Sequence, residues 1–482
     1  MSSTLERLRR LHNLQPQTGK SIVERVATPT DPVAAPVLSG APNAGHPADA
    51  TQLEALVPGE IIENSNGACY VVTERYPLQA QRGALALAEL LGQSPHTFAT
   101  FHPTFGLHEA LDFRQAIFLD TETTGLGNGA GVYCFMIGVG AFERLTPVNA
   151  GGAGKPTDPH PLSSAQPPTH FVVRQFFMRN PGEEGALLLA VAELIDHYAM
   201  SVTFNGRTFD LPLLRTRWRQ NQHIYPELRG SGRLLQPERP HLDLLHPARR
   251  LWKRRLQSCR LINLETEILG LRRSADDVPG HLIPQLYTDY LHSGNACALG
   301  NIFYHNREDI VSMVALATHL SRAYQGQADP TGAQLQGLDW LSLGQCYEEQ
   351  GECHAAEQAY QRALSDLRGA AAQAAIFQRL GQLQKGQARW EEATATWQQW
   401  ITTVPGSDPT PFIELAKYCE WRGKDLEQAA MWTQWALHNL RTAPVQSQTT
   451  DQIAALEHRL ARLQRKRTQS IDAQSVLDAE EA

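Results

Sequence analysis

Long apolar segments are missing from this chain of 482 residues. No stretch approaches the roughly 18 uninterrupted apolar residues that a membrane-spanning helix needs, so the sequence predicts a soluble protein. The first residues, MSSTLERLRRLHNLQPQ, do not contain the apolar core of a cleaved signal peptide. We therefore expect a cytoplasmic location.

Clustered cysteines and an excess of basic residues are also missing. The seven cysteines form no CxxC pair and no Cys/His group with zinc-ligand spacing, which predicts reduced, mostly buried thiols. Lys and Arg total 43 against 50 Asp and Glu, and the net charge of -7 gives no general attraction to nucleic acid. A nucleic-acid partner would need a local basic patch or bound metal ions.

The length predicts two or three folded units. Residues 1–55, rich in Pro, Ala and Gly, are expected to be a disordered leader. Residues 56–325 begin with a hairpin at Asn66 and Gly67 and continue with three apolar strands, interrupted by a surface loop at 146–168. Helices and strands then alternate, which predicts an α/β domain with a mixed sheet flanked by helices.

Residues 335–442 contain helical patterns only, and the patterns repeat. Gly381 follows Gly344 by 37 residues and Ala416 follows Gly381 by 35, each among bulky residues. This spacing is typical of tetratricopeptide repeats, in which each helical pair buries its apolar face against a neighbour. The aromatic residues of the repeats are expected to be packing positions. A capping helix at 450–470 and a polar tail at 471–482 complete the predicted organisation.

Acidic residues follow or flank several predicted elements. Asp120 and Glu122 stand two apart at a strand end, which points both side chains to one face of the sheet. Asp210 opens a helix, where it could equally be an N-cap. His305 and Asp309 are four apart on one helical face, a spacing that ordinary helix residues also have. Each motif alone is weak, but the ordered set is more specific.

Together these motifs resemble the DEDD exonucleases of the ribonuclease H-like superfamily. FLDTETTGL is similar to the first motif, FNGRTFDLPLL to the second and HNREDI to the third. The longer similarity, from about Pro58 to about Tyr324, is to the YprB-type branch of predicted exonucleases. The resemblance implies a ribonuclease H-like domain in which Asp120, Glu122, Asp210 and Asp309 hold two divalent ions, Mg²⁺ or Mn²⁺. Two such ions stabilise the charge that develops in phosphodiester cleavage, and they prefer hard oxygen ligands.

The third motif departs from the family's two usual forms. The tyrosine subclass has Tyr four residues before the Asp and the histidine subclass has His five before it, whereas here His305 is four before Asp309 and Tyr304 is five before it. One helix cannot aim both side chains at one water molecule. We favour His305 as the catalytic base, because an ordinary histidine pKa near 6.5 suits a base at neutral pH.

A basic segment lies between Pro247 and Arg273, with eight basic residues against two acidic ones. It could bind phosphates, and Trp252 could stack on a base. A solvated helix face with Trp252 packed inward explains the pattern equally well. The residues taken as substrate-binding are Asn205, Arg249, Arg250, Trp252, Lys253, Arg254 and Arg255. Asp243, at another strand end, is left outside the catalytic set.

The function expected from these patterns is metal-dependent hydrolysis of phosphodiester bonds. The resemblance implies a 3'-5' exonuclease that acts on single-stranded DNA or RNA, with the helical repeats binding a protein partner. The exchanged Tyr and His and the acidic net charge keep a second hypothesis open: a non-catalytic nucleic-acid-binding or adaptor protein built on a nuclease fold. An endonuclease would share the same metal site.

Overall fold

The computed structural model describes residues 52–99, 101, 105–125, 129, 131–145, 167–326, 335–406, 408–442 and 449–480. The predicted leader up to residue 51 and the predicted loop from 146 to 166 lie outside these ranges. No helix in the described part of the chain is long and apolar enough to cross a lipid bilayer. All seven cysteines are free and five of them are buried, in agreement with the sequence.

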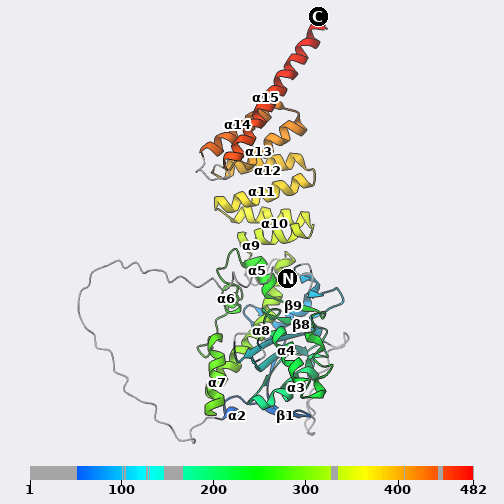
Figure 1. Ribbon diagram of the computed structural model, residues 1–482, viewed down its shortest axis with the longest axis vertical. Coiled ribbons are helices and arrows are strands. Elements are labelled where there is room, and N and C mark those ends of the chain that lie inside the picture. Colours follow the sequence, from blue (N-terminus) through cyan, green and yellow to red (C-terminus); the bar gives the residue numbers. More distant parts are fainter. Residues whose placement is uncertain are drawn as a thin grey trace, which may run out of the picture. The chain divides into compact units, whose positions relative to one another are not determined.

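A mixed seven-stranded sheet forms the core of the N-terminal part (Figure 1). Its strand order is β1-β2-β7-β6-β5-β8-β9, in which β5, β8 and β9 run parallel and the other neighbours run antiparallel. The predicted mixed sheet is therefore confirmed. The strands are β1 Glu60–Asn64, β2 Gly67–Pro77, β5 Ala116–Thr123, β6 Cys134–Glu143, β7 His170–Phe177, β8 Met200–Thr203 and β9 His241–Asp243, with a separate pair of β3 Gln81–Arg82 and β4 Leu85–Ala86.

Helices cover both faces of this sheet. Along β5, Ile117 and Leu119 enter a core shared with α3 and α4, whereas Ala116 and Phe118 enter a second core shared with α5, α6 and most of α8. This alternation follows from the two-residue period of a strand. The helices are α2 Leu53–Leu56, α3 Glu184–Ile195, α4 Asp210–Asn221, α5 Leu245–Trp252, α6 Leu261–Glu267, α7 Ile283–Ser293 and α8 Leu299–Tyr324, with short 3-10 turns between several of them.

The long helix α8 lies very close to β5 and β6. Gly138 on β6 pairs with Asp120 on β5, and a Cβ at position 138 would lie 2.1 Å from Oδ1 of Asn306 on α8. A side chain at position 138 would therefore push α8 away. The glycine allows polar residues of α8 to reach the end of β5 that carries the acidic motif.

The C-terminal part of the described chain consists of helices that pack pairwise in sequence order (Figure 1). Gly344 packs against the ring of Tyr360, and Gly381 packs in the same way against Trp397 in the next helical pair. This recurrence fits the predicted repeats, whose tetratricopeptide nature stays a prediction. The helices are α9 Gly337–Glu349, α10 Cys353–Asp366, α11 Ala370–Gly386, α12 Trp390–Thr403, α13 Thr410–Tyr418, a π-helical turn Cys419–Gly423, α14 Leu426–Thr442 and α15 Thr449–Glu480.

Candidate active site

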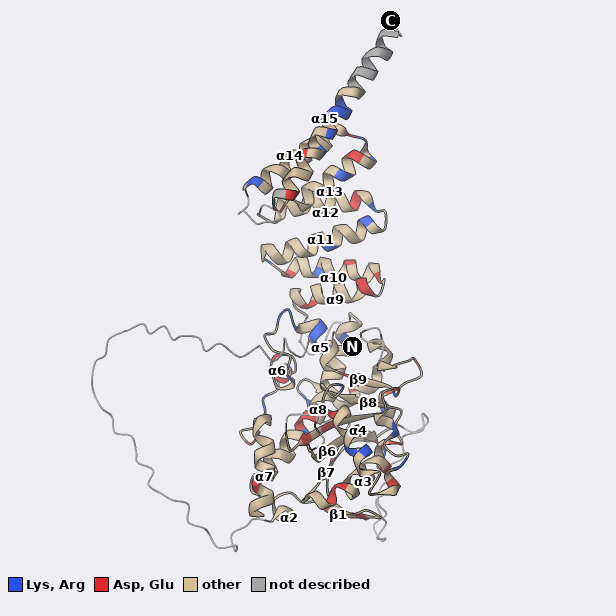
Figure 2. Cartoon of the chain, in the orientation of Figure 1, with Lys and Arg blue, Asp and Glu red and all other residues tan. Residues whose placement is uncertain are grey.

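Four carboxylates from three elements meet at one end of the sheet. Asp120 and Glu122 lie at the end of β5, Asp210 is the first residue of α4, and Asp309 lies on α8. Asp120 and Glu122 occupy the same strand face as Phe118, the face that α8 covers, as their spacing predicts. Figure 2 shows acidic segments beside α8 and a basic segment at α5. The structure thus brings the residues of all three sequence motifs together.

Asp120 is held by a buried amide. The Asn306 side chain donates to Oδ2 of Asp120 at 2.9 Å, and its own oxygen accepts a hydrogen bond from Gln175 on β7 at 2.9 Å. Gln175 also donates to the carbonyl of Phe303 at 2.8 Å. Because Asn306 is completely buried, this chain of hydrogen bonds fixes both its amide orientation and the position of Asp120.

Asp210 is oriented from the opposite face of β5. The Thr121 hydroxyl donates a short hydrogen bond to Oδ1 of Asp210. Helix α4 begins at Asp210, and its N-cap position is Phe209. Asp210 is therefore the first helical residue and not the N-cap that the sequence also allowed. Asp210 is only 5% exposed, and its charge contributes to the raised pKa values of Asp120 and Glu122.

Asp309 pairs with Arg273, the one cation in contact with the four carboxylates among the described residues. Arg273 itself is fixed by Glu265 on α6, to which Nε and Nη2 donate at 2.6 and 2.8 Å. Glu265 is 1% exposed and also accepts a hydrogen bond from Ser312 on α8. Arg273 is thus anchored from behind and presents its charge to Asp309.

Burial and neighbouring negative charges perturb the pKa values of Asp120, Glu122 and Asp210. Burial, followed by the charges of Asp309, Glu122 and Asp210, raises the pKa of Asp120 well above its usual range. Burial and the charges of Asp309 and Asp210 do the same to the pKa of Glu122, against a weaker opposing effect of Arg273. Burial raises the pKa of Asp210 to about 6, although the Thr121 hydrogen bond lowers it. The cluster therefore carries more negative charge than the protein neutralises.

His305 and Tyr304 occupy different environments. Nδ1 of His305 lies 2.7 Å from Oδ1 of Asp277 and 3.4 Å from Arg273, while Nε2 lies 3.9 Å from Oδ2 of Asp309. The shorter contact assigns the Nδ1 proton to a hydrogen bond with Asp277 and leaves Nε2 as the basic nitrogen. Tyr304 instead accepts the backbone N–H of Ser274 at 3.0 Å. The exchanged motif thus places the imidazole beside Asp309 and the phenol in a loop contact.

The basic residues predicted to bind substrate separate into three groups. Arg250, Arg254 and Arg255 contact Glu349, Gln345 and Asp339 of α9. Trp252 is 2% exposed and packs in the core beneath α5, so the expectation that it stacks on a base is wrong, because its ring faces the sheet domain. Arg249 and Lys253 are exposed and line a hollow together with Asn205.

Asp243 has a structural role that explains the shape of the loop before α4. Its carboxylate accepts the backbone N–H groups of Asn205 at 2.8 Å, Arg207 at 3.0 Å and Leu245 at 3.1 Å. These bonds hold Asn205 in a left-handed conformation with φ of 68°. Leaving Asp243 out of the predicted ligand set agrees with these contacts.

The sequence did not identify the residues that position the site. Thr121 and Asn306 stand next to predicted residues, but only the folded contacts reveal that they hold Asp210 and Asp120. Asp277 lies in the segment SADDVPG, which carries no periodic signal. Arg273 was recognised as basic, but not as the partner of Asp309. The signal that could have located Asn306 is its place three residues before Asp309 on one helical face.

The four carboxylates suit a divalent ion in the type of donor that they provide. The four carboxylates provide hard oxygen donors of the type that Mg²⁺ and Mn²⁺ prefer, and their mutual repulsion favours a cation between them. Within the described ranges, however, no three His, Cys, Asp or Glu side chains already surround a common position suited to an ion. The donors therefore fit such an ion in type, while Thr121, Asn306 and Arg273 each hold one of them in a protein contact.

Comparison with known proteins supports a nuclease-type domain. A family model described as RNase_H superfamily matches residues 162–321. That range includes Asp210 and Asp309 and begins after Asp120 and Glu122. The chain is also 28% identical over 407 residues to the "Uncharacterized protein YprB" of Bacillus subtilis (strain 168). The matched region covers 83% of this chain and 86% of that protein. The N-terminal part is therefore similar to RNase H superfamily domains, in agreement with its mixed sheet and flanking helices.

Proposed function

We propose that this protein is a metal-dependent nuclease that hydrolyses phosphodiester bonds as a 3'-5' exonuclease on single-stranded nucleic acid. The observation that carries the proposal is the meeting of Asp120, Glu122, Asp210 and Asp309 at one sheet end, where burial and the neighbouring carboxylates raise the pKa values of Asp120 and Glu122, and burial raises that of Asp210. Perturbed carboxylates of this kind cluster at functional sites. Similarity to the RNase H superfamily supports the same reaction class.

The four carboxylates would hold two divalent ions, which supply charge stabilisation at the reacting phosphate and lower the pKa of the attacking water. Asp309 would turn from Arg273 toward the ions, and Arg273 would remain fixed by Glu265. Asn306 and Thr121 limit the rotation of Asp120 and Asp210 through their hydrogen bonds.

His305 would take the proton of the attacking water at Nε2. Asp277 accepts the Nδ1 hydrogen, which fixes the tautomer and stabilises the imidazolium that forms. The Tyr304 hydroxyl is engaged by the backbone N–H of Ser274, which leaves the imidazole of His305 as the better-placed base.

The test uses purified protein with 5'-end-labelled single-stranded DNA and RNA, in Mn²⁺, Mg²⁺ or EDTA. Stepwise shortening that needs a divalent ion and is lost in Asp120→Asn supports the proposal. The matched control is Asp276→Asn, since Asp276 is exposed and contacts only Ser274 among the described residues. Binding without cleavage of either polymer in any of these ions would favour the non-catalytic binding or adaptor protein instead.

A further inference from the structure

A polar hollow lies beside the loop that leads into α4, whose first residue is Asp210 of the carboxylate cluster. Its volume is about 620 Å³, and its walls come from that loop, from α5 and from the segment between α5 and α6. Phe204 and Asn205 form the wall nearest the loop. Arg249 and Lys253 of α5 form the opposite wall together with Arg260. We call this space the α5 hollow.

The α5 hollow is positively charged. Arg249, Lys253 and Arg260 are exposed and form no ion pair within the described part of the chain, and no acidic residue lines the space. The positive charges also act on Cys259, which lines the hollow. Burial raises the pKa of the Cys259 thiol, and the charges of Arg249 and Lys253 oppose that effect. The other three arginines of this helix and its C-terminal end contact α9. The cations at and just after helix α5 thus include some that pair with α9 and others, Arg249 and Lys253, that line the hollow without an ion pair among the described residues.

A single loop connects the hollow to the carboxylates. Asn205 lines the hollow, and the same loop ends at Asp210, the first residue of α4. Asp243 fixes the loop by accepting the backbone N–H groups of Asn205 and Arg207, and its charge contributes to the raised pKa of Asp210. The cationic and anionic surfaces therefore lie on two sides of a rigid, hydrogen-bonded turn.

We propose that the α5 hollow binds the phosphate backbone of a single nucleic-acid strand whose reacting end lies at the carboxylates. This inference rests on the proposed function and names where the rest of the substrate is held. Three unpaired cations suit successive phosphates, and the half-buried ring of Phe204 offers an aromatic platform for a base, the combination that single-strand-binding grooves use. Phe204 thus takes the stacking role that the buried Trp252 cannot fill.

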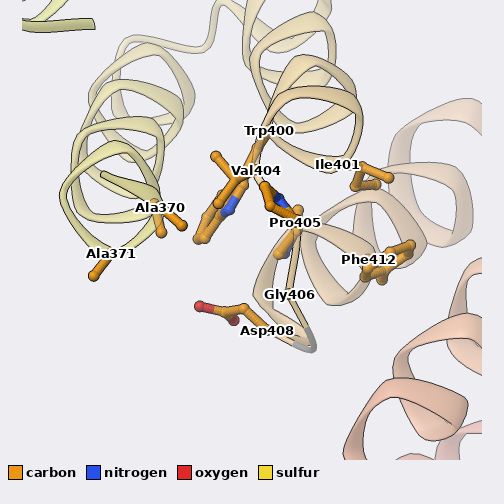
Figure 3. A pocket seen from close by; sticks show the side chains of 11 residues that line it. Ala370, Ala371, Trp400, Ile401, Val404, Pro405, Gly406, Asp408 and Phe412 are labelled. Atoms are coloured by element: carbon orange, nitrogen blue, oxygen red, sulfur yellow. The ribbon is translucent and has the colours of Figure 1, made fainter. Parts of the chain in front are cut away.

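The hollow in the helical region lacks these features (Figure 3). It has a volume of about 240 Å³ and is lined mainly by apolar residues of α11, α12, α13 and the loop between α12 and α13, including Trp400, Val404 and Phe412. Its one charged residue is Asp408, which would repel a phosphate. A polyanionic strand is therefore matched by the α5 hollow and not by this one.

The experiment measures binding of fluorescent single-stranded DNA and RNA 16-mers in EDTA, over a range of salt concentrations. The test variant combines Arg249→Ala, Lys253→Ala and Arg260→Ala. The control combines Arg368→Ala, Lys424→Ala and Arg465→Ala, which removes the same number of exposed Arg and Lys side chains from the helical region. The slope of log K against log salt should become shallower by about 2 in the test variant, at about 0.7 per lost phosphate contact, and stay unchanged in the control.

Two further variants separate charge from folding. Arg249→Lys with Arg260→Lys keeps the cations and should keep the salt slope, whereas Phe204→Leu should weaken binding about tenfold at every salt concentration. DNA and RNA should respond alike, because the contacts are to phosphates; a slope change in one polymer alone would overturn a purely backbone interaction. Equal salt slopes in the test and control variants would also overturn the inference.

The outcomes for the hollow and for the nuclease are distinguishable. If the wild-type protein shortens the strand but the test variant binds with an unchanged salt slope, the α5 hollow is not the binding site and the proposed function stands. If the salt slope falls as expected but no metal supports cleavage, the hollow stands and the proposed nuclease fails. Absence of any binding by the wild-type protein would overturn the inference.

Discussion

In the helical region Glu420 is a buried carboxylate surrounded by three cations, whereas in the sheet domain four carboxylates share a single arginine. The Glu420 side chain is 1% exposed, and Arg459, Arg462 and Lys466 of α15 contact it at 2.8 to 3.2 Å. The cluster around Asp120 has Arg273 alone, which pairs with Asp309. A buried charge is costly unless it is paired. The charge of the first site is therefore balanced within the protein, whereas the second has one arginine for four carboxylates and is where the proposed ions would bind.

This difference also separates the two basic groups of the sequence. The cations of α15 are used by Glu420 and attach the terminal helix to the π-helical turn. Those of α5 are divided between α9 and the open hollow. Two basic segments that look alike in the sequence thus differ in the structure. A basic side chain that pairs with an acidic residue of the protein is not available to a ligand, whereas an unpaired one is.

Removing one carboxylate of the cluster should abolish cleavage without loss of stability. Asp210→Asn is expected to lower the rate on the order of 10⁴-fold, because charge stabilisation by bound ions is worth several kcal/mol. The amide can still accept the Thr121 hydrogen bond, and the loss of one repelling charge should leave the melting temperature equal or higher. Rates on an end-labelled strand and thermal unfolding check both parts; unchanged cleavage would contradict the site.

The two candidate bases should respond unequally. His305→Ala is expected to slow cleavage roughly 10²- to 10³-fold, because a positioned general base contributes at this scale. Tyr304→Phe should have a small effect, since the phenol accepts a loop N–H on the helix face away from Asp309. Single-turnover rates at neutral pH measure both. Loss of metal-dependent activity in Tyr304→Phe with activity retained in His305→Ala would reverse the assignment.

The acid of the helical region should behave in the opposite way. Glu420→Ala leaves Arg459, Arg462 and Lys466 without their shared partner, which costs about 3 kcal/mol of unfolding free energy, at the lower end for a broken buried pair because two of the cations are nearly half exposed. Cleavage per folded molecule should remain unchanged. Denaturant unfolding measures the loss of stability, and cleavage assays at low temperature measure the activity per folded molecule. A stable, inactive Glu420 variant would break the comparison.

Much of the fold and of the carboxylate set could be predicted from the sequence. The strand period placed Asp120 and Glu122 on one face. The mixed sheet was predicted from three consecutive strands followed by alternating helices and strands. Trp252 was ambiguous because an amphipathic helix does not reveal which face meets the core until its neighbours are known. Asp277 and Gln175 could not be found, since their roles arise from contacts between segments 28 and 131 residues apart. Local patterns do not encode such pairings.

Divalent ions should stabilise the sheet domain in a pH-dependent way. Because the pKa of Asp210 is raised to about 6 from its usual 3.8, the folded protein keeps a proton that the unfolded chain loses, so metal-free stability falls as the pH rises between these values. Ion binding displaces that proton, and stabilisation by Mg²⁺ should therefore grow as the pH rises through about 6, reaching about 2.7 kcal/mol at a hundred times the dissociation constant. Thermal unfolding with and without Mg²⁺ checks this. Asp210→Asn should make the stabilisation by Mg²⁺ less dependent on pH. The same pH dependence in Asp210→Asn and in the wild-type protein would contradict this prediction.

The smallest effect on the cleavage rate is expected for Asp277, which contacts the proposed base His305 and not the substrate phosphate. Asp277→Asn removes the charge that accepts the Nδ1 hydrogen of His305, while Arg273 still faces the ring, so the conjugate acid of His305 loses stabilisation. We expect about a tenfold lower rate, in the range found for partners that orient active-site groups. Single-turnover rates at neutral pH measure this effect. Asp276→Asn, one residue away and exposed, should leave the rate unchanged. An unchanged rate in Asp277→Asn would mean that Asp277 supports only the loop, and the histidine would then act without a carboxylate partner.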